Sequence, residues 1–94
     1  MLVIRKLNST QTETLKAIFH PEMSAKIQWK KAQNLLIALG ASIKEGEGSA
    51  VVFSLNNRRF VVHKPHPGKE ISKHSVRGFR SFIESNAQYA VEAV

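Results

Sequence analysis

Two short runs rich in valine and phenylalanine, joined by a pair of asparagines, constrain the fold of this chain more than any other feature. Residues 50–55 and 58–63 have the composition of β-strands. Asn56 and Asn57 tolerate the positive φ angles that a two-residue hairpin loop requires. The sequence therefore predicts an antiparallel hairpin, and a loop of this length also fixes the register of its two strands.

The register of this hairpin predicts which side chains share a face, because successive strand residues point to opposite sides of a sheet. One face is apolar and should join the core: Val51, Phe53, Leu55, Phe60 and Val62. The opposite face is mixed and carries a cation, Arg59, and an imidazole, His63. The same register places Ala50 directly opposite His63 on this mixed face.

Apolar residues at helical spacing predict three helices, and one further alternating run predicts a strand. The helices are expected at residues 10–19, 28–39 and 73–85, and the strand at residues 41–46. Residues 86–94 are expected either to extend the last helix or to fray.

The resulting order of helix, helix, three strands and helix predicts a small α+β fold. A three-stranded antiparallel sheet would pack its apolar face against the second and third helices as a two-layer sandwich. Trp29, Phe53 and Phe60 are expected to be buried. The 94 residues are expected to form a single domain.

The chain has a strongly basic charge balance, with fourteen Lys and Arg against seven Asp and Glu and a net charge of +7. This balance favours a polyanionic partner, either nucleic acid or an acidic protein, although a basic surface also serves solubility alone. The absence of cysteine excludes disulfide and thiolate chemistry. No apolar run is long enough to span a bilayer, and the first residues lack the order of a secretory signal. We therefore expect a cytoplasmic protein without a membrane partner.

Basic residues recur on one face of the last predicted helix, at i, i+4 and i+7. Such a stripe can neutralise phosphates, although a solvated helix face has the same appearance. Further cations lie nearby in the sequence, which favours contact with RNA. The candidate RNA-binding residues are Arg58, Arg59, Lys64, Lys69, Lys73, Arg77 and Arg80.

His63 and His66 are the candidate catalytic residues. Cleavage of RNA without a metal needs a base for the 2′-hydroxyl and an acid for the leaving 5′ oxygen, and imidazole suits either role. The alternative is that both histidines are ordinary residues of a strand and a stiff loop. The histidines lack the spacing of a zinc site, so no metal and no cofactor is expected. Ser49 has no base at a fixed spacing in the sequence, which argues against a serine hydrolase.

These pieces, in their order and spacing, resemble the HicA toxin family. The resemblance covers residues 27–86. It is carried by Ala38-Leu39-Gly40-Ala41, Glu47-Gly48-Ser49, the hairpin to Arg58-Arg59, the run from His63-Lys64-Pro65-His66 to Glu70, and the basic closing helix. It implies a double-stranded-RNA-binding-like fold, ribonuclease activity on mRNA and inhibition by a HicB-type antitoxin. Residues 1–26 would then be an N-terminal helical extension, and residues 87–94 a C-terminal tail.

The sequence departs from this family at one important position. The family commonly has a catalytic histidine just after its Gly-Ser pair, and that position falls here at Ala50 or Val51. Either the catalytic group has moved to His63 on the neighbouring strand, or it has been lost. The chain is accordingly expected to be a metal-independent endoribonuclease of a toxin–antitoxin system, or a catalytically silent module that binds RNA or the antitoxin.

Overall fold

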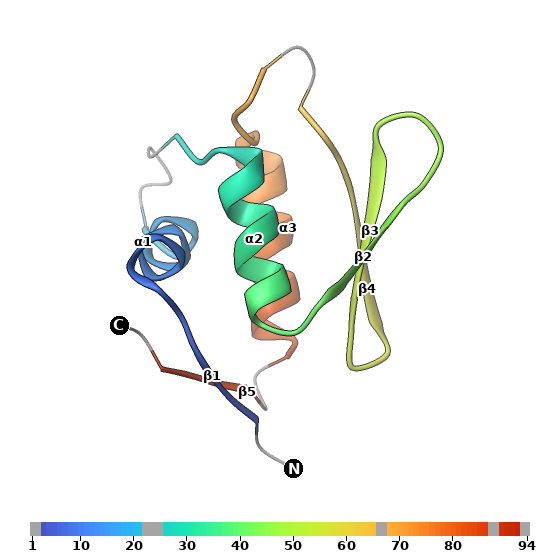
Figure 1. The fold of residues 1–94 in the computed structure, drawn as a ribbon. Helices are drawn as coiled ribbons and strands as arrows, with labels where there is room; N and C mark the ends of the chain where they lie inside the picture. Colours follow the sequence, from blue (N-terminus) through green and yellow to red (C-terminus); the bar gives the residue numbers. More distant parts are fainter. Residues whose placement is uncertain (1–2, 22–25, 66–67, 87–88, 93–94) are drawn as a thin grey trace.

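The computed structural model describes residues 3–21, 26–65, 68–86 and 89–92, with only the backbone described for residues 3–6 and 89–92 (Figure 1). The elements in this part of the chain are β1 (Val3–Lys6), α1 (Ser9–Ile18), α2 (Trp29–Ala38), β2 (Ser42–Glu45), β3 (Ala50–Leu55), β4 (Arg58–His63), α3 (Lys73–Glu84) and β5 (Tyr89–Glu92). None of the helices in these residues has the length and apolar character needed to cross a bilayer.

The predicted α+β fold and its helix–strand–strand–strand–helix core are confirmed. Strands β2, β3 and β4 form one antiparallel sheet in that order. The hairpin has the predicted register, with Phe53 paired with Phe60 and Ala50 with His63. Asn56 and Asn57 adopt φ angles of 52° and 64°, which is the backbone geometry that the two-residue loop requires.

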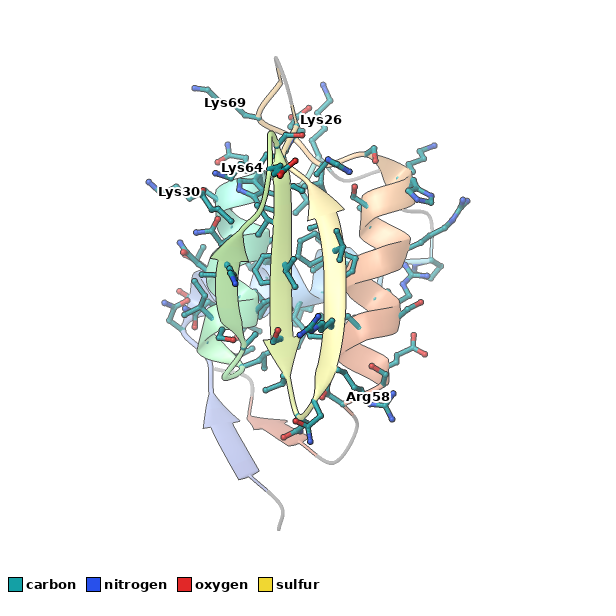
Figure 2. All side chains as sticks on the ribbon, turned by 90° about the vertical axis from the view of Figure 1, so that its right-hand side faces the viewer. Lys26, Lys30, Arg58, Lys64 and Lys69 are labelled. Carbon is teal, nitrogen blue, oxygen red and sulfur yellow. The ribbon has the colours of Figure 1, made fainter. Side chains whose placement is uncertain are left out.

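The elements form layers. Helices α2 and α3 lie side by side over one face of the sheet, and α1 lies on the far side of this helix pair (Figure 1). None of the helices in the described residues lies over the second face of the sheet (Figure 2). This open face contains Arg59 and His63, since both alternate with the buried residues of β4.

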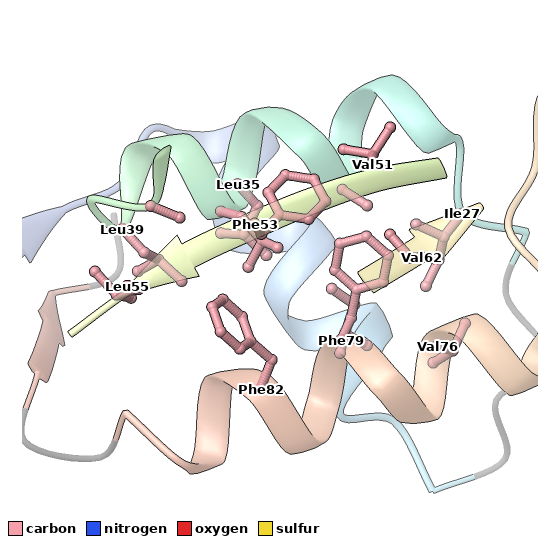
Figure 3. Close-up of a cluster of buried hydrophobic side chains, with 14 of the residues drawn as sticks. Ile27, Leu35, Leu39, Val51, Phe53, Leu55, Val62, Val76, Phe79 and Phe82 are labelled. Atoms are coloured by element: carbon pink, nitrogen blue, oxygen red, sulfur yellow. The ribbon is translucent and has the colours of Figure 1, made fainter. Parts of the chain in front are cut away.

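The core lies between the sheet and the helices (Figure 3). Phe53 and Phe79 are fully buried, and Phe60 packs edge-on against Phe79 with ring centroids 5.0 Å apart. Phe60 also stacks on Phe82 at 5.6 Å. Burial of Phe53 is confirmed, whereas Phe60 and Trp29 are only partly buried. Phe60 is only partly buried because it lies on β4, which is an edge strand. Trp29 is only partly buried because it is the first residue of α2.

The segment after β4 is tied to the start of α2. The backbone N–H of Trp29 donates to the Lys69 carbonyl at 2.7 Å, and that of Ile71 donates to the Ile27 carbonyl at 2.8 Å. An isolated bridge joins Gln28 to Glu70 between these two bonds. The end of the sheet therefore lies beside the first turn of α2.

The expectation that residues 86–94 extend the last helix or fray is wrong where the structure describes them. Asn86 is buried, and its side-chain amide donates to the Phe82 carbonyl at 2.8 Å. This bond satisfies a carbonyl of the last helical turn. Beyond it, β5 pairs with β1 as a parallel two-stranded sheet, a contact between distant segments that local periodicity does not reveal. Residues 87–88 and 93–94 lie outside the described residues.

Gly78 tests how tightly the aromatic rings are packed. A Cβ at this position would lie 2.7 Å from Cε1 and 2.9 Å from Cζ of Phe60. In an exposed helix, Gly→Ala would stabilise the fold by about 1 kcal/mol. We expect Gly78→Ala to lower the free energy of unfolding instead, by about 1–3 kcal/mol, because the Phe60 ring must shift. Urea denaturation measures this change.

Ser81→Ala on the exposed surface of α3 is the matched control and should change the free energy of unfolding by less than about 0.5 kcal/mol. A Gly78→Ala protein more stable than the wild type would show that Phe60 has room to move.

Candidate functional site

The last residue of β4 forms the centre of the candidate site. His63 is exposed on the open face, and its Nδ1 lies 3.1 Å from Oγ of Ser49. The carbonyl of Ser49 accepts a bond from the Lys64 N–H at 2.9 Å, so the hydroxyl is held beside the ring from the neighbouring chain segment. With Nδ1 engaged by the hydroxyl, Nε2 is the ring nitrogen that remains for proton transfer.

In the sequence, no base stands at a fixed spacing from Ser49, and the contact with His63 was not anticipated. The two residues are 14 positions apart and meet only through strand pairing. A signal for this contact was present in the hairpin register, because Ala50 pairs with His63 and Ser49 is the residue before it.

An ion pair joins the ends of β2 and β4. The Lys64 ammonium donates to the Glu45 carboxylate, with 39% and 69% of the respective side chains exposed. The hydrogen bond from Lys64, followed by the attraction of its charge, lowers the pKa of the Glu45 carboxyl. Lys64, expected as a phosphate ligand, thus already has an acidic partner.

The predicted RNA-binding residues are divided between several places. Lys64 and Lys69 lie at the end of the sheet where β4 finishes, whereas Arg58 lies at the opposite end beside the hairpin loop (Figure 2). Arg59 is on the open face, and Lys73 and Arg77 are exposed on α3. His66, the second catalytic candidate, lies outside the described residues.

Two cations near Lys64 and Lys69 were missed by the sequence analysis. Lys26 and Lys30 lie at the same end of the molecule (Figure 2). Lys30 is exposed in the first turn of α2. Nothing local indicates this grouping, because it depends on the backbone bonds between the start of α2 and the segment after β4.

The spacing of Arg80 predicts a side chain exposed like those of Lys73 and Arg77, but Arg80 is half-buried against α1. Its Nε and Nη2 donate to the Ile18 carbonyl at 3.0 and 2.7 Å, and Nη2 donates to the His20 carbonyl at 3.1 Å. The guanidinium also lies over the Phe19 ring, 5.7 Å from its centroid. Arg80 therefore caps the end of α1 and fastens it to α3.

A comparison with protein families shows which family the chain belongs to. The family described as the HicA toxin of bacterial toxin–antitoxin systems matches residues 29–81, more than half of the chain. The chain belongs to the HicA toxin family. Curated proteins and solved structures give no significant match. The matched part runs from the start of α2 to within α3. The predicted division of this HicA protein between an extension at residues 1–26 and a domain at residues 27–86 stays a prediction.

In the described part of this HicA protein, no three His, Asp or Glu side chains gather as ligands for a metal ion. An imidazole next to a hydroxyl can move protons, and the exposed lysines at this end of the molecule can hold phosphates.

Replacing Arg80 tests its structural role. Arg80→Gln removes the charged donor from two helix-end carbonyls and the cation from the Phe19 ring. We expect the free energy of unfolding to fall by about 2 kcal/mol, the order found for hydrogen bonds to charged groups. Arg77→Gln, on the exposed face of the same helix, should change it by less than about 0.5 kcal/mol in the same urea titration. Equal losses in the two proteins would contradict the capping role.

The Glu45–Lys64 pair predicts a dependence on pH. Because the folded pKa of Glu45 is lowered, the pair stabilises the fold above the ordinary pKa of glutamate, and this contribution disappears as the pH falls through the lowered value. In Lys64→Gln, the Glu45 pKa should rise towards its ordinary range, as measured by an NMR titration of the side-chain carboxyl carbon. Lys44→Gln, adjacent in sequence, is the control. An unchanged midpoint in Lys64→Gln would show that the pair does not form in solution.

Proposed function

We propose that this HicA protein is a metal-independent endoribonuclease that cleaves mRNA, and that His63 transfers the proton in this reaction. The observation that carries the proposal is the contact between His63 Nδ1 and Ser49 Oγ, opposite Ala50. Ala50 and Val51 occupy the place in which the family commonly has its histidine. His63, on the neighbouring strand β4, places an imidazole on the same face of the sheet as Ala50.

The proposed reaction needs no group beyond those of the protein and the RNA. A base removes the proton of the 2′-hydroxyl, the 2′ oxygen attacks the adjacent phosphorus, and the bond from phosphorus to the 5′ oxygen breaks. An acid supplies a proton to that leaving oxygen, which gives a 2′,3′-cyclic phosphate and a 5′-hydroxyl. His63 serves as one of these two groups, and His66 is proposed as its partner because it follows within the same short segment.

Cations around His63 are proposed to bind the RNA backbone. Lys64 and Lys69 lie at the same end of the sheet as His63, and Arg59 lies on the same face of β4 (Figure 2). Arg58, Lys73 and Arg77 are proposed to contact more distant phosphates. Arg80 is not part of this set, because backbone carbonyls already engage its guanidinium.

A second candidate function is a catalytically silent protein that binds RNA or an antitoxin. The observation in its favour is the pair of apolar residues, Ala50 and Val51, at the position of the usual histidine. In either case we propose a HicB-type antitoxin as the protein partner and the cytoplasm, where mRNA is translated, as the location.

Replacement of His63 separates these two functions. His63→Ala should reduce cleavage of mRNA about 100- to 10,000-fold, because a general acid or base is lost, while RNA and antitoxin binding persist. His74→Ala, exposed in the first turn of α3, is the matched control and should keep full activity. Ser49→Ala should cause a smaller loss, since it only frees the ring that the hydroxyl holds. Cleavage of a labelled transcript and growth after induction are the measurements.

Two outcomes would decide against this assignment. Equal cleavage by wild type and His63→Ala would show that another group transfers the proton. If the wild-type protein binds its antitoxin and RNA but does not cleave the RNA, the second candidate function, a catalytically silent binding protein, is correct.

A further inference from the structure

A pocket of about 400 Å³ lies between the start of α2 and the segment that follows β4. Its lining includes Trp29 and Lys30 from the helix and Lys64, Pro65 and Lys69 from the segment. The volume falls within the range of roughly 300–1,000 Å³ that is typical of small-molecule sites. The pocket is therefore large enough for a single small ligand.

The charge around this pocket comes from lysine side chains and not from the helix end. The first N–H of α2, that of Trp29, already donates to the Lys69 carbonyl at 2.7 Å. Lys64 forms an ion pair with Glu45 in which both side chains remain partly exposed. Lys30 and Lys69 are both exposed, and among the described residues neither forms an ion pair. Two uncompensated cations thus border the pocket.

The apolar part of the pocket lining, formed by Trp29 and Pro65, suits a flat apolar group and not an anion. Trp29 packs against Phe53 and Phe79 with ring centroids 6.0 and 6.1 Å away, so the core holds the indole in place. Trp29 is half-buried overall and lines the pocket beside Pro65, whose ring fixes its own backbone φ. Flat aromatic surfaces of this kind stack on nucleobases of any type, since every base has a π face.

We propose that this pocket binds one unpaired nucleotide of a single-stranded RNA, with the base against Trp29 and Pro65 and the phosphate between Lys30 and Lys69. A phosphate complements the two cations, and a base complements the aromatic lining. The inference rests on the proposed function, because it identifies the pocket as a subsite of that reaction.

The position of the pocket connects it to His63. Lys64 borders the pocket and is the residue after His63, with Cα atoms about 3.8 Å apart. The two side chains leave the strand on opposite sides, His63 towards the open face and Lys64 towards α2. A nucleotide held in the pocket therefore directs the next phosphodiester around the end of the sheet towards the imidazole.

The experiment uses the fluorescence of Trp29, which is the single tryptophan of the chain. The full-length His63→Ala protein, which we expect to bind RNA without cleaving it, is titrated with adenosine 5′-monophosphate, ribose 5-phosphate and an acidic peptide. We expect saturable quenching by the nucleotide and binding of ribose 5-phosphate that is weaker by about tenfold, because it lacks the base. The acidic peptide should cause no change. Equal affinity for the two phosphates would overturn the base-binding part, and quenching by the peptide alone would reassign the pocket to a protein partner.

Adjacent lysines of α2 provide matched variants. Lys30 borders this pocket, whereas Lys31 lines a separate hollow beside α1. Lys30→Glu should weaken nucleotide binding by about tenfold through the loss of one phosphate contact and added repulsion, and Lys31→Glu by less than about twofold. Equal effects would indicate general electrostatic attraction and overturn the proposal. These titrations measure binding and not cleavage. If His63 proves not to be catalytic, the nucleotide affinity of the pocket is unaffected, and if the pocket binds no nucleotide, the catalytic role of His63 is unaffected.

Discussion

The two-residue loop at Asn56 and Asn57 sets the strand register on which both the core and the candidate site depend. Each residue takes a left-handed φ, and the strands leave the loop with Phe53 opposite Phe60 and Ala50 opposite His63. A shift of one residue would turn every side chain of one strand to the other face. If β4 were the strand that turned, Phe60 would face solvent and His63 would face the helices, so a single backbone feature determines packing and chemistry together.

The aromatic rings explain why only one face of the sheet is available for function. Phe60 lies on an edge strand and reaches between Phe79 and Phe82, where Gly78 leaves the space that its ring occupies. Both core helices are thereby held on one side of the sheet. The other side keeps Arg59, Val61 and His63 exposed, and 59% of Val61 remains accessible.

The sequence alone predicted the features that depend on neighbouring residues. Helices α2 and α3 and the hairpin follow from hydrophobic periods of 3.6 and 2 residues. Their observed bounds differ from the expected ones by at most one residue at either end. The candidate site was predicted less completely. The register predicted the positions of His63 and Arg59 on the open face and of Ala50 opposite His63.

The features that were missed depend on contacts between distant segments. Arg80 has the helical spacing of a solvent-exposed residue, yet it caps a helix that ends 62 positions earlier in the chain. Lys30 belongs to the polar face of its helix, and its place beside Lys69 depends on backbone bonds across the fold. The contact of Ser49 with His63 joins residues 14 positions apart, and the hairpin register indicated only that the two lie near each other.

The parallel pairing of β1 with β5 has a consequence for synthesis of the protein on the ribosome. Val3–Lys6 is made before every other described element, and its partner Tyr89–Glu92 is made after all of them. All the residues that match the HicA family emerge while β1 still lacks its partner strand. During that interval its backbone N–H and C=O groups are open to water or to a strand of another molecule. The nascent chain can therefore form the β2–β3–β4 sheet and helices α2 and α3 before β1 pairs with β5.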